Sequence, residues 1–236
     1  MRFILIVILT YLLVSCGEIT TTNTNTPGAI APNKEGTTST LAPQPRSSTT
    51  TKNVGSAPAV APKWLCIPGK QVGLIKNTST EADIIKAYGK SNVIRRTIGL
   101  GEGETTDGTV VFPDTDNEIT IEWAKDKAFQ KPAKVRIEKA NTAWKTDQGI
   151  GVGTTLAQLE AINGKDFKFA GFEWDYAGIA NNWQGGNIDK RLTVFLEANN
   201  PKALYPNLIG DSLFDASNPK AKAADLRVRT LIIGLD

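Results

Sequence analysis

Apolar side chains recur at helical spacing in two segments of the chain. The two stripes are formed by Ile84, Ile85 and Tyr88, and by Leu156, Leu159 and Ile162. Thr80 precedes the first stripe and Thr155 precedes the second. Asp83 and Gln158 each lie three residues after the corresponding threonine, which is the pattern of a capping box at the start of a helix. The sequence therefore predicts two short helices, each of which needs a sheet to pack against.

The two helical segments are related by an offset of 75 residues. At this offset, Ile75, Thr80, Ala82, Ile84, Gly89 and Lys90 align with Ile150, Thr155, Ala157, Leu159, Gly164 and Lys165. Gly89 and Gly164 each follow a predicted helix, at the position where a left-handed residue commonly ends it. We interpret the similarity as a tandem repeat, with repeat 1 at about residues 67–140 and repeat 2 at about residues 144–236.

Strand-like patterns follow each predicted helix. Ile119, Ile121 and Trp123 alternate with polar residues, which is the period of a half-buried strand. The predicted strands are residues 92–94, 109–112, 118–123 and 134–138 after the first helix, and residues 167–170, 172–176, 191–197 and 226–235 after the second. We therefore expect an α+β fold of two tandem repeats, each a short helical segment followed by an antiparallel sheet.

The first residues of the chain have the pattern of an export signal. Arg2 precedes an apolar run that is shorter than the ~20 residues a membrane-spanning helix needs, and the run ends in Leu13-Val14-Ser15-Cys16. These four residues resemble the lipobox of bacterial lipoproteins, which are cleaved before the cysteine and lipidated on its thiol. The resemblance implies a signal peptide at residues 1–15 and a lipid anchor on Cys16, and Gly17 in place of Asp implies the outer membrane. An ordinary secretory signal with a coincidental cysteine is the alternative.

Residues 16–62 are predicted to be a disordered tether behind the lipidated cysteine. Residues 17–62 contain eleven Thr, four Ser and six Pro but no aromatic residue. Such a segment cannot bury enough apolar surface to offset the entropy that ordering costs. Residues 63–236 contain all five Trp and are long enough to form a globular core.

Charge and residue usage exclude several functional classes. Residues 63–236 carry 23 Lys or Arg against 22 Asp or Glu, so the sequence shows no basic footprint for nucleic acid. The chain has no histidine, which excludes catalytic triads with a histidine base and metal sites ligated by histidine. We expect no cofactor and no metal. Because Cys16 is expected to carry the lipid, Cys66 has no partner within the chain and is predicted to be a free, buried or semi-buried thiol, with a disulfide between two chains as the alternative.

The sequence around the second predicted helix resembles a known family. Residues 149–164, GIGVGTTLAQLEAING, followed by antiparallel strands, resemble the SmpA/OmlA-type outer-membrane lipoproteins and the tandem-repeat β-lactamase inhibitory proteins, which share that architecture. Motifs of uncharacterised lipoproteins from Bacteroidetes-like bacteria are similar to residues 76–83, 101–104, 109–113 and 171–176. The resemblance covers most of residues 67–236 and implies a fold and a location more than an activity.

An aromatic cluster is the main candidate for a functional surface. On a strand at residues 172–176 the aromatic side chains would share one face, and Glu173 and Asp175 would share the other. Packing of the aromatic face in the core is the first interpretation. The second is a partner or ligand surface formed by Phe172, Trp174, Tyr176 and Trp183. The third is acid–base catalysis on a glycan by Glu173 and Asp175.

Three shorter motifs, at residues 210–213, 114–118 and 99–104, predict turns or connections between strands. Residues 210–213 match the signature of the GDSL esterases, but the chain has no histidine to act as base. Residues 211–213 also resemble a short O-glycosylation sequon of Bacteroidetes periplasmic proteins, which makes Ser212 a candidate glycosylation site. Residues 114–118 lack the glycine and glutamate of an EF-hand calcium loop and predict a hairpin turn. The glycine-rich residues 99–104 predict a connection between strands.

These features predict a non-enzymatic lipoprotein of the cell envelope, anchored to the outer membrane through Cys16, with a binding module for a protein or glycan partner. A carboxylate-dependent enzyme that acts on glycan is one alternative. A structural subunit of an outer-membrane assembly is the other.

Overall fold

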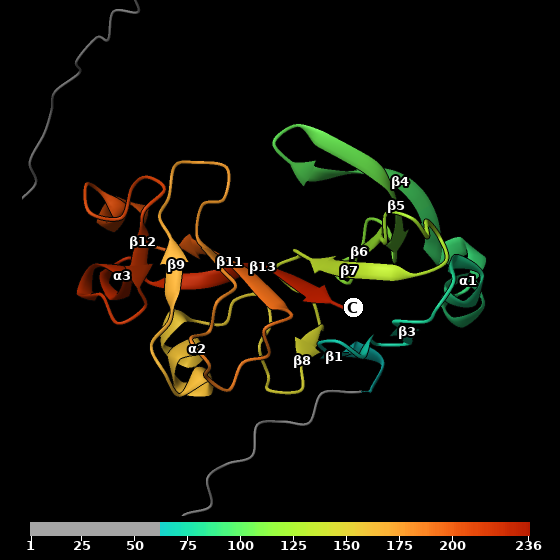
Figure 1. Cartoon of the computed structure of the whole chain (residues 1–236), viewed down its shortest axis with the longest axis horizontal. Helices are drawn as coiled ribbons and strands as arrows, with labels where there is room; N and C mark the ends of the chain where they lie inside the picture. The colour runs from blue at the N-terminus through green and yellow to red at the C-terminus, as the bar shows by residue number, and fades with distance from the viewer. Residues whose placement is uncertain (1–61) are drawn as a thin grey trace, which may run out of the picture. The chain divides into compact units, whose positions relative to one another are not determined.

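The computed structural model describes residues 62–236. The predicted signal peptide, Cys16 and nearly all of the predicted tether lie outside the described residues. The described residues form a mixed α/β structure that is mostly sheet, with few helices (Figure 1). In this part of the chain the helices are all too short to cross a membrane. We refer to residues 62–143 as the first half and to residues 144–236 as the second half.

Seven antiparallel strands from both halves form the largest sheet, in the order β10-β11-β13-β7-β6-β5-β4. In this order the strands are β10 (Ile179–Ala180), β11 (Leu192–Ala198), β13 (Leu226–Gly234), β7 (Pro132–Ile137), β6 (Ile119–Trp123), β5 (Glu104–Val111) and β4 (Val93–Gly101). A four-stranded sheet has the order β3-β2-β1-β8, and a two-stranded sheet pairs β12 with β9. These strands are β1 (Leu65–Ile67), β2 (Gln71–Val72), β3 (Ile75–Lys76), β8 (Lys145–Thr146), β9 (Lys168–Ala170) and β12 (Leu213–Asp215).

The described α-helices are α1 (Glu81–Tyr88), α2 (Leu156–Asn163) and α3 (Pro219–Ala223), with 3-10 turns η1 (Pro62–Trp64), η2 (Lys90–Asn92) and η3 (Pro201–Leu204). The two predicted helices and their capping boxes are confirmed. Thr80 accepts a hydrogen bond from the Asp83 N–H at 3.2 Å, and the Asp83 carboxylate accepts one from the Thr80 N–H at 2.9 Å. Thr155 and Gln158 make the same pair of bonds at the start of α2.

The predicted left-handed end is right for only one of the two helices. Gly164 after α2 has φ 68° and ψ 1°, which is the left-handed helical region. Gly89 after α1 has φ 88° but ψ 142°, so the chain leaves the helix in an extended direction. Both glycine N–H groups still donate to a carbonyl of the last helical turn, at 2.9 Å each. The prediction of where each helix ends is therefore confirmed, and the predicted geometry at Gly89 is wrong.

One face of the large sheet forms the core. Ile121, Val135 and Ile233 lie side by side on this face and are fully buried. Cys66 is a free, buried thiol, as predicted. Burial, with a smaller effect from the charge of Asp147, raises the pKa of this thiol to about 12, so it remains protonated at neutral pH.

The predicted strand at residues 172–176 is wrong. Phe172 makes a single bridge, with Ile209, and the chain then bends and turns. Glu173 has φ 68°, which does not continue a strand. The Gly178 N–H donates to the carbonyls of Ala170 and Gly171, both at 3.1 Å, and so closes a loop. The alternating aromatic and acidic residues at positions 172–176 therefore lie in a turn, and their alternation does not reflect the two-residue period of a strand.

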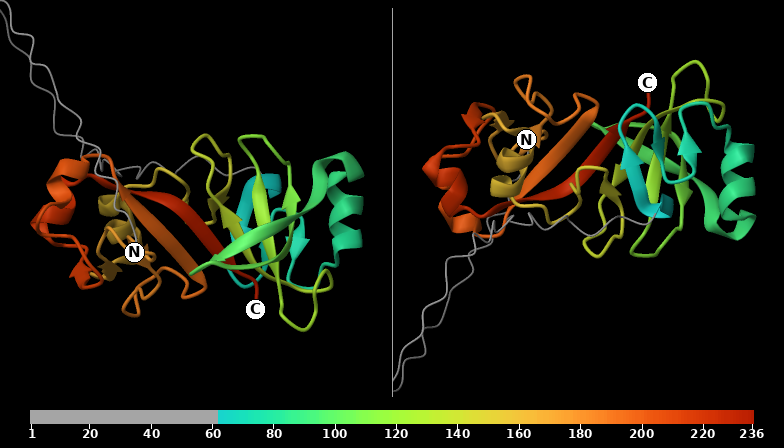
Figure 2. Two further views of the ribbon diagram at one scale, coloured as in Figure 1. Left: turned by 90° about the horizontal axis from the view of Figure 1, so that it is seen from above. Right: turned by 90° about the horizontal axis from the view of Figure 1, so that it is seen from below.

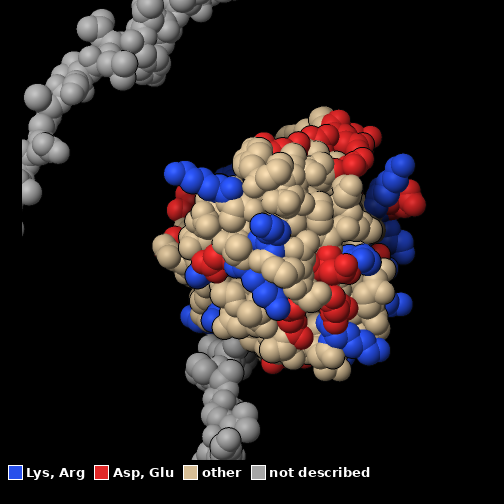
Figure 3. Space-filling model, turned by 90° about the vertical axis from the view of Figure 1, so that its left-hand side faces the viewer, with Lys and Arg blue, Asp and Glu red and all other residues tan. Residues whose placement is uncertain are grey.

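Charges of both signs are spread over most of the face shown in Figure 3, in line with the near balance of the composition. Acidic side chains gather at the upper end of that view. The tip of the hairpin formed by β4 and β5 also lies at the upper side of the described residues in Figure 1.

Candidate binding groove

The hairpin of β4 and β5 extends beyond the sheet to which it belongs. The two strands pair with each other from Val93 to Gly101, but β5 pairs with β6 only at Thr109, Val110 and Val111. Residues 96–108 therefore form a two-stranded ribbon, which we call the β-arm. From above, the β-arm lies across the sheet and is directed toward the strands of the second half (Figure 2).

Gly108 lies at the point where the β-arm leaves the sheet. It is buried, and a Cβ atom added to it would lie 2.7 Å from Ile98 Cδ1 and 2.9 Å from the main-chain oxygen of Ile121. Side chains larger than hydrogen do not fit at this distance, so glycine allows Ile98 to fold over β5 here. Packing at the base of the β-arm thus requires glycine at position 108.

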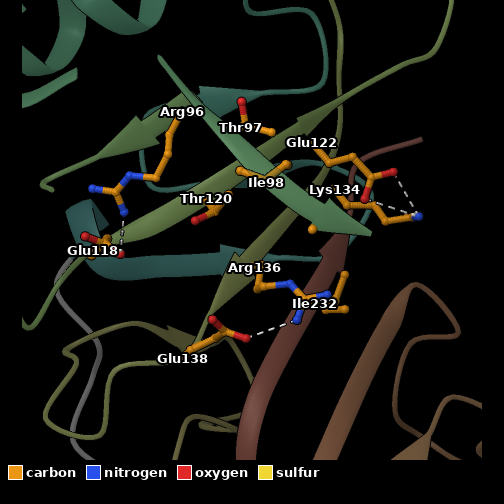
Figure 4. Close-up of a pocket in the computed structure, with 11 residues that line it drawn as sticks. Arg96, Thr97, Ile98, Glu118, Thr120, Glu122, Lys134, Arg136, Glu138 and Ile232 are labelled. Carbon is orange, nitrogen blue, oxygen red and sulfur yellow. Dashed lines mark hydrogen bonds and ion pairs between the residues drawn. The ribbon is translucent and has the colours of Figure 1, made fainter. Parts of the chain in front are cut away.

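A cavity of about 270 Å³ lies between the β-arm and the solvent-facing side of the sheet (Figure 4). We call this cavity the groove. Its roof is formed by Arg96, Thr97, Ile98 and Gly99 of β4. Its floor is formed by Glu118, Thr120, Glu122, Lys134, Arg136, Glu138 and Ile232, from β6, β7, β13 and the residues that flank them. The floor is the face of the sheet opposite to the core, and Figure 4 shows β4 crossing over it.

The charged side chains of the groove pair with one another. Lys134 Nζ lies 3.1 Å from Glu122 Oε1 on the neighbouring strand. Arg136 Nη1 lies 3.0 Å from Glu138 Oε1 on its own strand, and Arg96 Nη1 of the roof lies 3.5 Å from Glu118 Oε1. Each basic side chain of these pairs is at least one-third exposed. Pairs of this kind contribute only about 0–1 kcal/mol each, so a partner can replace them at little cost.

The tip of the β-arm contacts the loop at residues 171–178 of the second half. The Tyr176 phenol lies beside the carboxylate of Glu102 at the tip. Hydrogen bonding to Glu102 and its negative charge raise the pKa of the Tyr176 phenol, and the charges of Asp175 and Glu104 act in the same direction. The tip of the β-arm is thus in contact with the second half.

The structure separates the four aromatic residues of the predicted surface. Phe172 and Trp183 are 6% and 3% exposed, so their assignment to a surface is wrong. Trp183 packs on Phe167 with ring centroids 4.9 Å apart, and its Nε1–H donates to the Leu192 carbonyl at 2.9 Å. Both residues are part of the core, which was the first interpretation of the cluster.

Trp174 and Tyr176 stay accessible beside the end of the β-arm. Trp174 is 36% exposed, and its ring lies edge-on to Tyr176 with centroids 5.4 Å apart. The Trp174 Nε1–H donates to the Gly171 carbonyl at 2.9 Å, which fixes the ring. Glu173 and Asp175 are exposed, and neither lines the groove. Glu173 accepts a hydrogen bond from Tyr205 and raises the pKa of that phenol.

The remaining predicted sites lie apart from the groove. Ser212 is exposed, and its main-chain oxygen accepts a hydrogen bond from the Gly171 N–H at 2.9 Å. Residues 114–118 lie in the connection between β5 and β6, as the predicted hairpin turn requires. Among residues 62–236 the acidic and cysteine side chains form no group of three that could hold a metal ion.

Sequence reasoning missed the groove, although part of its signal is present. Lys134, Arg136 and Glu138 alternate with the buried residues Val135 and Ile137, so one face of this strand is charged and the other apolar. That pattern predicts a solvent-facing side of the sheet. It does not predict that the β-arm roofs this side, because the roof depends on contacts between residues distant in sequence.

Comparisons of the chain with models of protein families, with curated proteins and with solved structures give no match. The function of the protein is therefore inferred from the groove and the surfaces beside it.

Proposed function

We propose that the protein is a non-enzymatic, lipid-anchored protein of the bacterial cell envelope whose folded part is a binding module, and that the groove is its contact site for a partner protein. The observation that carries this proposal is the solvent-facing side of the seven-stranded sheet, which is roofed by the β-arm and lined by charged side chains. The basic side chains among them, Arg96, Lys134 and Arg136, are at least one-third exposed and make only surface ion pairs, so they can form new pairs with a partner.

The two halves are proposed to be tandem repeats, as the sequence offset suggests. The matching capping boxes of α1 and α2 support this proposal. So does the order of strands: β7, which ends the first half of the sheet, lies beside β13, which ends the second. On each side of this central pair, strands farther from the centre come from earlier positions in the chain: β11 and then β10 on one side, and β6, β5 and then β4 on the other.

The membrane anchor of the proposal rests on Cys16 and on the residues before it. Metabolic labelling with a palmitate analogue would attach label to the wild-type chain and not to Cys16→Ala. Separation of inner and outer membranes would then place the labelled protein in the outer membrane. A labelled chain found in the inner membrane would contradict that location.

A glycan is the second candidate partner, and the accessible ring of Trp174 favours it. Sugars stack on exposed aromatic rings, and carboxylates such as those of Glu173 and Asp175 accept hydrogen bonds from sugar hydroxyls. Binding to envelope polysaccharide that is lost in Trp174→Ala would support this candidate. If only the groove variants lose binding to the polysaccharide, the glycan candidate at Trp174 is contradicted.

The test of the groove uses reversal of charge on its floor. The intact lipidated protein, its double variant K134E/R136E and the control K220E/K222E on α3 are purified from gently cross-linked envelopes, and mass spectrometry identifies the bound proteins. Lys220 and Lys222 are exposed and do not line the groove, so the control carries the same change of charge elsewhere.

We expect a protein partner at a fixed ratio with the wild type and the control, and its loss with K134E/R136E. Equal recovery with all three chains would refute the groove as the contact site. Recovery of no protein with any of them would shift the proposal to the glycan candidate.

A further inference from the structure

We propose that the occupant of the groove is an extended segment of the partner protein, which adds to the free edge of β4 as a further strand. This inference rests on the proposed function and narrows it to one kind of partner. It follows from the backbone of β4, from the position of that strand above the floor, and from the side chains of the groove.

The hydrogen-bonding pattern shows which backbone groups of β4 face away from the sheet. The Phe112 N–H donates to the Asn92 carbonyl at 2.8 Å, so these opposite residues form a hydrogen-bonded pair. Such pairs alternate along antiparallel strands. The register therefore places Ile94, Arg96 and Ile98 in bonded pairs with β5. The intervening residues, Arg95, Thr97 and Gly99, direct their N–H and C=O groups toward the free edge.

The free edge is long and without backbone partners. No backbone or side-chain hydrogen bond to the main chain of Arg95, Thr97 or Gly99 occurs among residues 62–236, apart from the pairing of the strand itself. The edge at the other end of the sheet, β10, has only two residues. Proteins usually protect long edge strands, because a row of unpaired N–H and C=O groups is a template for another chain. An edge left open over β4 is typical of strand addition.

The position of β4 directs an added strand into the groove. Residues 96–99 form the roof, opposite Lys134 and Ile232 of the floor. A neighbouring strand lies about 4.8 Å from the strand to which it bonds. An added segment therefore bonds to Thr97 and Gly99 and lies over the floor, with every second side chain directed toward it.

The side chains of the groove define the chemistry of this segment. Ile98 and Ile232 provide an apolar spot, and charged residues of both signs surround it. The segment accordingly carries one apolar residue, with polar or charged residues two positions before and after it. This pattern distinguishes it from a second copy of β4, in which two apolar residues, Ile94 and Ile98, face the same side as Arg96.

The β-arm is the part of the molecule that such a partner would stabilise most. It is a ribbon of two strands, and a ribbon of this kind is marginally stable without a third strand. Its base, the ion pair of Arg96 with Glu118 and the contact between Glu102 and Tyr176 hold it over the sheet. A segment bonded to β4 would complete a three-stranded structure and fill the groove beneath it.

The test uses the full chain and a defined probe, a phage-displayed library of random 12-residue peptides. The most enriched peptide is synthesised, and its dissociation constant is measured by calorimetry. Each peptide N–H is then methylated in turn. Strand addition predicts that methylation at alternate positions weakens binding by about tenfold, while methylation at the intervening positions changes it by less than about twofold.

A variant of the chain tests the same bonds from the other side. Thr97→Pro removes an N–H that faces the groove and none that pairs with β5, and proline is tolerated at such an edge. Thr97→Val removes the hydroxyl and keeps the N–H. We expect T97P to weaken peptide binding by about tenfold and T97V to leave it unchanged. Because the methylation series uses the wild-type chain, it remains decisive if T97P unfolds.

The outcomes separate this inference from the proposed function. Binding that is lost in K134E/R136E but shows no alternation with methylation and no effect of T97P would overturn strand addition and leave the groove as the contact site. Binding unaffected by any groove variant would overturn both. A library without enriched peptides would overturn the inference. So would a dimer that sedimentation detects in the wild type and not in T97P, because the edge would then pair with a second copy.

Discussion

The two halves of the molecule begin in the same way and end differently. Each starts its main helix with a threonine cap and a reciprocal bond three residues later. At its outer edge, however, the first half has the nine-residue strand β4, whereas the second half has the two-residue strand β10. The shared feature is local and stabilises a helix. The difference lies at the sheet edges, where the first half leaves the longer row of backbone groups at β4.

The last residues of the two helices show the same contrast on a smaller scale. Asn163 is fully buried and binds three main-chain groups: its Nδ2 donates to the carbonyls of Lys165 and Trp183, and its Oδ1 accepts from the Ile188 N–H. Tyr88, at the matching position of α1, is only partly buried, and its hydroxyl accepts one bond from the Leu74 N–H at 2.9 Å. The second half is therefore held together by a buried amide that the first half lacks.

The largest expected effect comes from removing that amide. Asn163→Leu keeps a similar volume but removes three hydrogen bonds to main-chain groups and leaves the buried Ile188 N–H without a partner, while the Trp183 carbonyl keeps its bond from the Gly186 N–H. We therefore expect the free energy of unfolding to fall by about 3 kcal/mol. Tyr88→Phe removes one bond near the surface and should cost about 1 kcal/mol or less. Urea unfolding followed by tryptophan fluorescence measures both. An equal decrease in the free energy of unfolding for both variants would contradict the proposed difference between the two helix ends.

The next largest effect is expected at an ion pair of the first half, between the buried carboxylate of Glu81 and the exposed side chain of Arg95. The Glu81 carboxylate accepts bonds from Arg95 at 3.0 Å and from the Thr109 hydroxyl at 2.8 Å, and Thr109 accepts the Trp123 Nε1–H at 3.0 Å. Burial acts to raise the pKa of Glu81, but the bonds from Arg95 and Thr109 and the charge of Arg95 outweigh burial and lower it. The ionised carboxylate therefore stabilises the folded state.

The lowering of the pKa of Glu81 determines how the stability of the protein depends on pH. Because the folded pKa of Glu81 lies below 4.5, its value without the protein environment, the stabilisation is complete above pH 4.5 and is lost as the pH falls through the folded pKa. We expect Glu81→Gln to cost about 2 kcal/mol at pH 7, and the difference from the wild type to shrink below pH 4.5. Urea unfolding at several pH values measures it. A difference that stays constant with pH would contradict the role of the charge.

The contrast between the halves also explains what the sequence could predict. The caps at Thr80 and Thr155 and the burial of Cys66 were predictable, because they depend on neighbours in sequence or on the absence of a partner cysteine. The strand at residues 92–94 was predicted too short, since the pairing that extends β4 to Gly101 comes from β5 and from the fold of the β-arm. Residues 172–176 were assigned to a strand because alternation along a turn imitates the period of a strand.

The groove could not be predicted for a related reason. Its roof and floor come from β4 and from β6, β7 and β13, and the last of these lies more than 120 residues along the chain from the first. The alternating charges of residues 134–138 predict an exposed face and nothing about what lies above it. Gly108 appears in sequence as an ordinary strand glycine, and only the contacts with Ile98 and Ile121 show why glycine is needed there.

Removal of the two helix caps tests whether the shared feature of the halves is equal in strength. Thr80→Ala and Thr155→Ala each remove one bond to a main-chain N–H in the first turn, so each should cost about 1 kcal/mol. Thr80→Ser and Thr155→Ser keep the hydroxyl and should restore most of the loss. Thermal unfolding followed by circular dichroism measures all four variants. A much larger loss at one helix would mean that the caps support tertiary contacts as well as the helix itself.

The smallest effect is expected at the contact that joins the halves, between Glu102 and Tyr176. Tyr176→Phe removes a phenol hydroxyl at the surface, beside the Glu102 carboxylate, so the overall stability should barely change. The β-arm, however, loses this contact with the second half, and its amide hydrogens should exchange several-fold faster, while those of β6 and β7 stay protected. Hydrogen exchange followed by mass spectrometry resolves the two regions. Tyr205→Phe, which removes the phenol hydroxyl beside Glu173 instead, is the matched control and should leave the β-arm unchanged. If exchange in the β-arm is the same in both variants, the arm is held by its base alone, and the open edge of β4 needs no release from the second half before a partner strand can bind.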